Sequence, residues 1–248
     1  MRARSVPVTT SIAGAPVLLT SVQAPEVAAR RGAVLVYHGF GGDKSQLGDL
    51  AGALADAGFL VVRVDAVGHG DRRRPDWDQV FSEQRWAEAE DETEAEFLAL
   101  LTATAAEVPA IVDELVASGR AHEGRLGITG RSLGGEISYA AVLAEPRIRA
   151  AAPMVGSPEW TLPWPDSPHR HPERFYPVPI LAHGAELDQF VPARYIRDFH
   201  DRLTPLYAQG PDRLRYVEYP GVDHFLTPEL WRETHQRVVA WFDRWLTP

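Results

Sequence analysis

One short stretch, residues 126–135 with the sequence LGITGRSLGG, constrains the fold more than any other part of the chain. An apolar, partly β-branched run ends in a G-x-S-x-G pattern centred on Ser132, and a helix-compatible sequence follows at once. A serine at the apex of a strand-turn-helix unit needs very small residues two positions before and after it, because strand and helix cross closely there. Gly130 and Gly134 meet this demand. The alternative is a serine that only caps a helix, so the rest of the chain has to decide between the two.

The composition excludes several kinds of protein. The 248 residues include no cysteine, which removes disulfides, thiolate metal sites and a cysteine nucleophile. The formal net charge of −9 argues against a nucleic-acid partner, because phosphate binding needs clustered cations. A hydrophobic content of 45% is enough for the core of one α/β domain with a small insertion.

Short apolar runs alternate with helical patterns along the chain, and continuous apolar runs predict strands buried on both faces. The expected strands are 33–37, 59–64, 126–129, 148–155, 178–183 and 214–219, with an edge hairpin from 5–12 and 16–23. The expected helices are 45–57, 82–118, 136–145, 192–209 (interrupted by Pro205) and 228–246, and 24–32 is expected to be a charged loop. The alternation predicts one α/β domain over residues 1–248, with a mostly parallel twisted sheet of about eight strands and helices on both faces.

Two segments depart from this alternation and are expected to cover the site as a cap or lid. Residues 71–108 begin polar and arginine-rich and continue into an acidic helical pattern, in which Pro109 predicts a kink or break. The acidic run is interpreted as a solvated helix face rather than a cation site. Residues 157–177 carry six prolines and two tryptophans, so no regular structure is expected there.

The N-terminal residues start basic, but prolines and hydroxyl residues interrupt their apolar run, which favours a strand over a signal peptide. No apolar run approaches ~18 residues, so no membrane span is expected. We therefore expect a soluble, cytoplasmic protein.

Four further motifs accompany the Ser132 turn between residues 38 and 225. They are His38–Gly42 (HGFGG), Asp65–Gly70 (DAVGHG), Asp188–Pro192 (DQFVP) and Gly221–Phe225 (GVDHF). In these motifs and their order the chain resembles the α/β-hydrolase superfamily, specifically its small serine esterases and dienelactone-hydrolase-like members. The resemblance implies an α/β-hydrolase fold with a small lid. One departure concerns the nucleophile, because dienelactone hydrolases use a cysteine where this chain has Ser132.

The resemblance also implies a catalytic triad in the order Ser132, Asp188, His224. His224 follows a predicted strand and turn, where the family places its histidine, and Asp188 matches the D-x-x-V-P register of related esterases. The gap before Asp188 is one residue longer than usual, which leaves Glu186 as an alternative acid. Asp223 is a poorer candidate, because neighbouring residues rarely direct their side chains to the required Nδ1 contact.

The expected oxyanion donors are the backbone N–H groups of Phe40 and Leu133, in the glycine-rich loop and directly after the nucleophile. Asp65 and His69 are interpreted as residues that hold a turn. Arg131 is expected either to meet a negatively charged substrate or to pair with a neighbouring acid. The side chains expected to line a substrate pocket are Arg131, Trp160, Trp164, Phe190 and Phe225.

These residues predict a serine hydrolase that cleaves a small-molecule carboxylic ester through an acyl-Ser132 intermediate, without cofactor or metal. A peptidase or thioesterase would use the same triad, although related peptidases usually carry a large extra domain for which 248 residues leave no room. A non-catalytic binding homologue would usually lack one of the three triad residues, and none is missing here.

Overall fold

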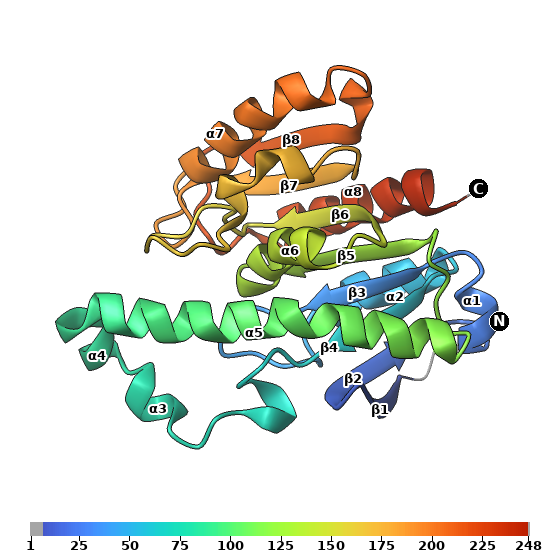
Figure 1. Cartoon of the computed structure of the whole chain (residues 1–248), viewed down its shortest axis with the longest axis horizontal. Coiled ribbons are helices and arrows are strands. Elements are labelled where there is room, and N and C mark those ends of the chain that lie inside the picture. The colour runs from blue at the N-terminus through green and yellow to red at the C-terminus, as the bar shows by residue number, and fades with distance from the viewer. Residues whose placement is uncertain (1–6, 248) are drawn as a thin grey trace.

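The chain is built around one twisted, eight-stranded sheet (Figure 1). The computed structural model describes residues 7–247. The strands are β1 Val8–Ile12, β2 Ala15–Thr20, β3 Ala33–Tyr37, β4 Leu60–Val64, β5 Leu126–Arg131, β6 Ile148–Met154, β7 Ile180–Ala185 and β8 Leu214–Tyr219. Their order is β1-β2-β4-β3-β5-β6-β7-β8; β2 is antiparallel to β1 and β4, and every other neighbouring pair is parallel. The predicted mostly parallel α/β sheet is confirmed.

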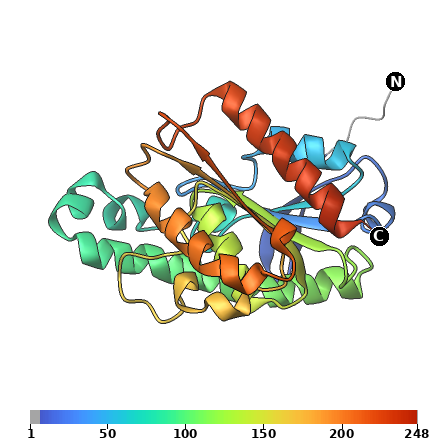
Figure 2. The ribbon, with the colours of Figure 1, turned by 90° about the horizontal axis from the view of Figure 1, so that it is seen from above.

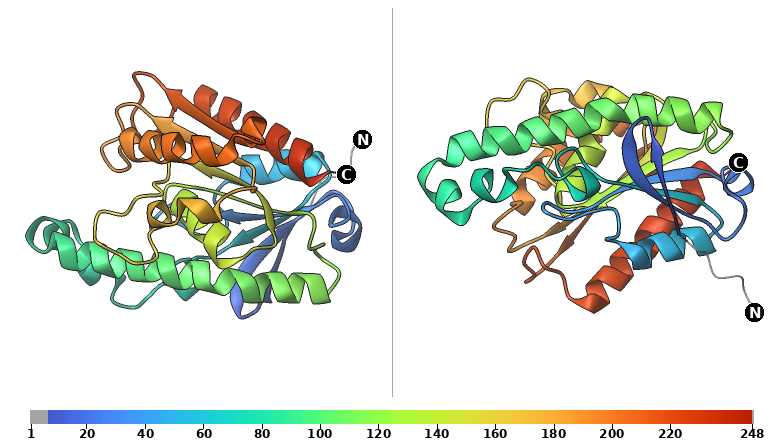
Figure 3. Two further views of the ribbon diagram at one scale, coloured as in Figure 1. Left: turned by 45° about the horizontal axis from the view of Figure 1, so that its top comes forward. Right: turned by 90° about the horizontal axis from the view of Figure 1, so that it is seen from below.

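Helices cover both faces of this sheet. The α-helices in the described part of the chain are α1 Pro25–Ala28, α2 Gly48–Asp56, α3 Trp77–Val80, α4 Glu83–Glu88, α5 Glu90–Ala117, α6 Leu133–Ala144, α7 Ala193–Leu203 and α8 Pro228–Leu246. Short 3-10 turns lie at Gly70–Arg72, Pro168–Arg170, Pro172–Arg174, Thr204–Tyr207 and Pro211–Arg213. Helices α2 and α8 lie on one face, and α5, α6 and α7 lie on the other (Figures 2 and 3).

The two-residue period of a strand divides the core between these faces. In β3, Val34 and Val36 pack with the residues of α2 and α8, whereas Leu35 and Tyr37 pack with the residues of α5 and α6. All five β3 residues are buried, which explains why the sequence shows a continuous apolar run there rather than an alternating one.

The topology gathers the chemically suggestive loops at one edge. The carboxyl ends of the six parallel strands lie at the same edge of the sheet, and the chain reverses its direction of winding between β3 and β5. The loop after β3 carries the HGFGG motif, and β5 leads into Ser132. Ligands bind at such a switch point in open α/β sheets, so the site is built where the fold leaves a crevice.

Helix α5 differs from expectation in two respects. It runs unbroken from Glu90 to Ala117 with Pro109 inside it, so the expectation of a break there was wrong, and the discontinuity lies instead at Ala89 between α4 and α5. Among the described residues it is also the one helix with the length and apolar composition of a membrane span, with a mean hydropathy of 1.5 over an 18-residue window. Leu98 and Ile111 are among its apolar side chains that are fully buried in the protein core, and 39% of this window is buried.

Other segments agree more closely. The helix expected at 192–209 ends at Leu203 and gives way to a 3-10 turn that contains Pro205. Residues 157–177 contain only 3-10 turns and irregular backbone, as their prolines predict. Residues 24–32, expected to be a loop, contain the single-turn helix α1, which begins with Pro25 at its first position.

The packing of α8 on β5 can be tested with two glycines. A Cβ atom at Gly127 would lie 2.7 Å from a ring carbon of the buried Phe242, whereas a Cβ at Gly52 in α2 would meet no atom within 4 Å. We expect Gly127→Ala to lower the free energy of unfolding by about 1–3 kcal/mol, because α8 must shift to make room. The control Gly52→Ala should raise it by about 0.5–1 kcal/mol, since alanine favours helix. Urea unfolding monitored by circular dichroism measures both, and equal stabilities for the two variants would contradict this packing.

Candidate active site

Ser132 occupies a strained turn between β5 and α6. Its backbone has φ 55° and ψ −118°, and non-glycine residues rarely adopt a positive φ. The Ser132 N–H donates to the carbonyl of Met154 at 2.9 Å, and the Ser132 carbonyl accepts from the N–H groups of Gly135 and Glu136. These bonds tie the strained residue to the end of β6 on one side and to the first turn of α6 on the other.

The glycines around Ser132 are required by close backbone contacts. A Cβ at Gly134 would lie 2.1 Å from the carbonyl oxygen of Tyr37 at the end of β3, and one at Gly130 would lie 2.5 Å from the same atom. Gly135 is also tightly packed, because a Cβ there would lie 3.0 Å from Cα of Gly156. Helix α6 therefore approaches both β3 and the segment after β6 at distances that only glycine permits.

The structure brings Ser132, His224 and Asp188 together, although they are far apart in the sequence. The Oγ atom of Ser132 lies 3.0 Å from Nε2 of His224, and Nδ1 of His224 lies 2.7 Å from Oδ2 of Asp188. A carboxylate only accepts, so Nδ1 carries the proton and donates to Asp188. This tautomer leaves Nε2 free to accept the hydroxyl proton of Ser132.

Asp188 is fixed in position by the turn after β7. Its Oδ1 atom accepts from the N–H groups of Phe190 and Val191 at 2.9 and 2.8 Å, and its side chain is fully buried. Strand β7 continues to Ala185, two residues beyond the expected end, and the carbonyl of Ala185 accepts from the Asp188 N–H. Because the strand ends two residues later than expected, only Glu186 and Leu187 separate it from Asp188.

The two alternative acids lie elsewhere. Glu186 is exposed and accepts from the backbone N–H of Gly221 at 2.7 Å, so it stabilises the turn that precedes His224. Asp223 accepts from the N–H of Phe225 at 2.9 Å. Neither carboxylate contacts the imidazole of His224 in the described hydrogen-bond network, and both act on backbone instead.

The backbone N–H groups of Phe40 and Leu133 have no acceptor among residues 7–247. Leu133 is the first residue of α6, where helix N–H groups lack intrahelical partners. Phe40 lies in the loop after β3, which is closed by the Gly42 N–H bonded to the Gly39 carbonyl at 3.0 Å. A developing negative charge on a substrate oxygen is the kind of group that such free donors stabilise.

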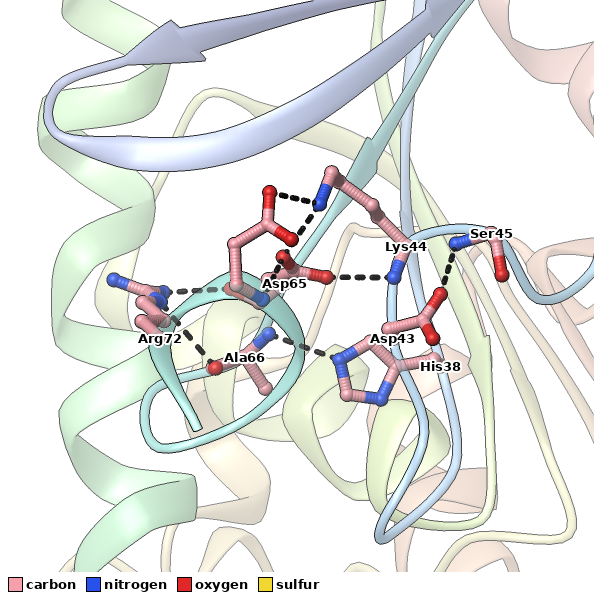
Figure 4. Close-up of polar contacts among 8 residues, drawn as sticks. His38, Asp43, Lys44, Ser45, Asp65, Ala66 and Arg72 are labelled. Atoms are coloured by element: carbon pink, nitrogen blue, oxygen red, sulfur yellow. Dashed lines mark hydrogen bonds and ion pairs between the residues drawn. The ribbon is translucent and has the colours of Figure 1, made fainter. Parts of the chain in front are cut away.

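The loop after β3 is held by His38 (Figure 4). The N–H of Ala66 donates to His38 Nε2 at 3.0 Å, so Nδ1 carries the proton and bonds the Gly39 carbonyl at 2.8 Å. Burial lowers the pKa of His38, which keeps the ring neutral and preserves its role as an acceptor. Burial likewise lowers the pKa of the neighbouring His69 to about 4.

A buried ion pair fastens the loop after β4 to the loop after β3 (Figure 4). Asp65 is fully buried and accepts from the backbone N–H of Lys44 at 2.6 Å, from its Nζ at 2.8 Å and from the Asp71 N–H at 2.9 Å. Lys44 Nζ also bonds Asp71 at 2.6 Å. Asp65 therefore holds a turn, and the Nδ1 atom of His69 bonds the Val67 carbonyl at 2.9 Å within the same turn, in agreement with their interpretation from the sequence. The Lys44 contact is an addition that the motif does not contain.

A pocket of about 960 Å³ opens next to Ser132 and His224. Trp160, Phe190 and Phe225 line it, although Phe190 and Phe225 are 74% and 71% exposed and form its outer rim. The structure places Trp164 outside this pocket, half-buried against the main core, which removes it from the expected lining. The lining residues are drawn chiefly from the loops after the parallel strands, from 83–97 and from 157–162, so both expected cap segments contribute.

Arg131 lines the pocket but pairs with no acid in the described residues. Its guanidinium lies over the ring of Trp231, 5.6 Å from the ring centre, and burial lowers its pKa. Two pocket acids, Glu94 and Glu136, are not among the site residues predicted from the sequence. Glu136 could have been found from its spacing. It lies four positions after the nucleophile, about one helical turn, so it lies on the same face of the helix as Ser132.

Comparison with known proteins is consistent with this geometry. Residues 18–241 match the dienelactone hydrolase family. The chain belongs to the dienelactone hydrolase family. Members are hydrolases, and this chain is an enzyme of that class. A relative from Bacillus subtilis (strain 168), YitV, provisionally named an esterase, is 25% identical over 243 residues, which cover 86% of this chain and 89% of YitV.

Solved structures show the same fold. TT1662 from Thermus thermophilus is 21% identical to this chain, with a TM-score of 0.76. The match covers 96% of this chain and 98% of TT1662. A puromycin-hydrolyzing peptidase from Mycobacterium tuberculosis is 20% identical with a TM-score of 0.70, and the match covers 98% of this chain but 39% of the peptidase. At these identities the likeness concerns the fold.

The buried ion pair under the HGFGG loop generates a prediction. Asp65→Asn keeps the shape but leaves Lys44 without its buried counter-charge, so we expect the free energy of unfolding to fall by about 3 kcal/mol. Asp78→Asn is the matched control, because Asp78 pairs with Arg73 at the surface with its side chain 92% exposed, and it should change stability little. Chemical denaturation of both variants measures the difference. Similar, small losses would show that Asp65 does not fasten the loop.

Proposed function

We propose that this protein hydrolyses carboxylic esters through a covalent acyl-Ser132 intermediate. The observation that carries the proposal is the continuous hydrogen-bonded path from Ser132 Oγ through His224 to Asp188, at the wall of a pocket. His224 Nε2 takes the hydroxyl proton as Oγ attacks the carbonyl carbon, and the resulting oxyanion lies against the N–H groups of Phe40 and Leu133.

The same ring completes the reaction. His224 returns its proton to the alkoxide as the C–O bond of the ester breaks, and the alcohol leaves an acyl-serine behind. A water molecule then gives a proton to His224 and attacks the acyl carbon, and collapse of the second tetrahedral intermediate returns the proton to Ser132 and releases the acid. Asp188 stays ionised throughout; it orients the ring and stabilises the imidazolium. This sequence consumes one water and needs no cofactor or metal.

The substrate class follows from the size and composition of the pocket. A volume of about 960 Å³ suits a small molecule, and its aromatic and aliphatic walls suit the apolar parts of an ester. Amides and thioesters pass through the same intermediates, so a panel separates the candidates: short p-nitrophenyl esters, aminoacyl amides and acyl-CoA thioesters. The proposal requires the highest kcat/KM on the esters.

The role of Ser132 is tested by its removal. Ser132→Ala should lower kcat on p-nitrophenyl esters by about 10⁴-fold or more, because no nucleophile remains. A fluorophosphonate probe should label the wild-type protein at Ser132 and leave the variant unlabelled, as intact-mass measurement would show. Ser118→Ala, at the exposed end of α5, should leave both readouts unchanged. Ester turnover that survives in Ser132→Ala would overturn the proposal.

The choice between two acids is tested by a pair of isosteric substitutions. Asp188→Asn should lower kcat by about 10²–10⁴-fold, because an amide no longer holds the required tautomer of His224 or balances its charge. Glu186→Gln should retain activity within about threefold, since Glu186 bonds only the backbone of Gly221 in the described network. Steady-state kinetics on one ester settles the matter. A larger loss in Glu186→Gln than in Asp188→Asn would reverse the assignment.

A further inference from the structure

Acidic side chains predominate among the charged residues that line the pocket beside Ser132. Six carboxylate side chains line it, and Arg131 is the single lysine or arginine side chain that does. Three of the acids, in α4 and at the start of α5, are exposed at its outer part, whereas the others lie deeper. The six are Glu83, Glu90, Asp91, Glu94, Glu136 and Glu159.

Glu136 is the decisive member of this set. It belongs to the first turn of α6, four residues after Ser132, and only 7% of it is exposed. Glu136 lines the pocket, and its Oε2 atom is buried and has no hydrogen-bond partner within the described residues. Burial raises the pKa of Glu136 well above its ordinary value, and the charge of Glu94 raises it further. A hydrogen bond from the Ser157 backbone opposes this rise only in part, and a buried carboxylate oxygen without a partner is costly unless something satisfies it.

Glu94 faces the same space from α5. It is half-buried, its Oε1 accepts from Thr161 Oγ1 at 2.9 Å, and burial raises its pKa. A cation placed between these two carboxylates would favour the ionised form of both. The negative charge of the whole chain would add to the attraction of such a cation into the pocket.

The chemistry of the wall distinguishes the kind of cation. Within residues 7–247 no three acidic or histidine side chains converge closely enough to hold a metal ion. Aromatic rings of Trp86, Phe97 and Trp160 line the pocket beside the acids. Carboxylate acceptors beside aromatic faces suit an organic ammonium group, which donates N–H bonds and also lies favourably over rings.

We infer that the preferred ester carries a protonated amine, which binds against Glu136 and Glu94 while the ester carbonyl lies at Ser132. This substrate class rests on the proposed ester hydrolysis. Arg131 lies over Trp231 and forms no ion pair with these acids among the described residues, so they are not neutralised by the one arginine of the pocket.

Matched substrates test the inference. Methyl 6-aminohexanoate and methyl heptanoate differ by an ammonium in place of a methyl group in the acyl half. 6-Aminohexyl acetate and heptyl acetate differ in the same way in the alcohol half. We expect kcat/KM, measured by acid release in a pH-stat at neutral pH, to favour the amine in at least one pair by about tenfold.

Two substitutions assign the preference to named residues. Glu136→Gln and Glu94→Gln should each reduce the amine-to-methyl ratio of kcat/KM to about threefold or less. Glu173→Gln, at an exposed position outside the pocket, is the matched control and should keep both the wild-type ratio and the wild-type activity. Using the ratio cancels any change in the amount of folded enzyme, and the Glu94 variant keeps the test valid if Glu136→Gln does not fold.

The outcomes separate this inference from the function on which it rests. If the neutral esters are cleaved through Ser132 but the amines bring no advantage in either pair, the amine site is wrong and the esterase stands. If the preference exists but persists in both glutamine variants, the amine binds elsewhere and the inference is equally wrong. If neither member of any pair is hydrolysed, the proposed ester hydrolysis fails first.

Discussion

The crossing of α6 over β3 and β5 is the contact on which the site depends. Gly130 and Gly134 let the turn around Ser132 pass within van der Waals contact of the Tyr37 carbonyl. A methyl group at either position would overlap that carbonyl oxygen. The crossing also fixes Ser132 in a backbone conformation that costs about 1–3 kcal/mol. Bonds from the end of β6 and from the first turn of α6 offset this cost. Because nucleophile, helix N-terminus and the loop after β3 share this crossing, their relative positions are set by backbone rather than by adaptable side chains.

Much of this architecture could be predicted, because buried strands and helices show characteristic hydrophobic patterns in the sequence. The strand 214–219 and the helix 228–246 have the bounds observed for β8 and α8, since turn-forming residues flank the strand and an amphipathic pattern marks the helix. The helix break expected at Pro109 from local propensity does not occur, because α5 is long and packed against the core and continues through the proline. A proline weakens one turn, and the burial on either side of it holds the helix together.

The candidate site was likewise predictable from the sequence only in part. The resemblance implied Ser132, Asp188 and His224, each of which follows a predicted strand, and the sheet brings them into hydrogen-bonding contact; their catalytic roles are proposals. The pocket wall could not be predicted in this way. The acidic run at the start of α5 does include exposed side chains, as a solvated face requires, but Glu94 turns inward to Thr161. Which acids of such a run face a cavity depends on how the helix lies over the sheet, and periodicity alone does not contain that information.

Phe40 connects two parts of the molecule that are usually considered separately. Its N–H is one of the two donors proposed for the oxyanion, while its ring packs against Trp77, Phe81 and Phe97 of the cap segment, with ring centres 4.9, 5.0 and 5.3 Å away. A bulky ligand that pushed these rings aside would also pull the amide out of alignment. Oversized molecules would then be discriminated through a lower kcat rather than a higher KM, so the enzyme would bind them without hydrolysing them.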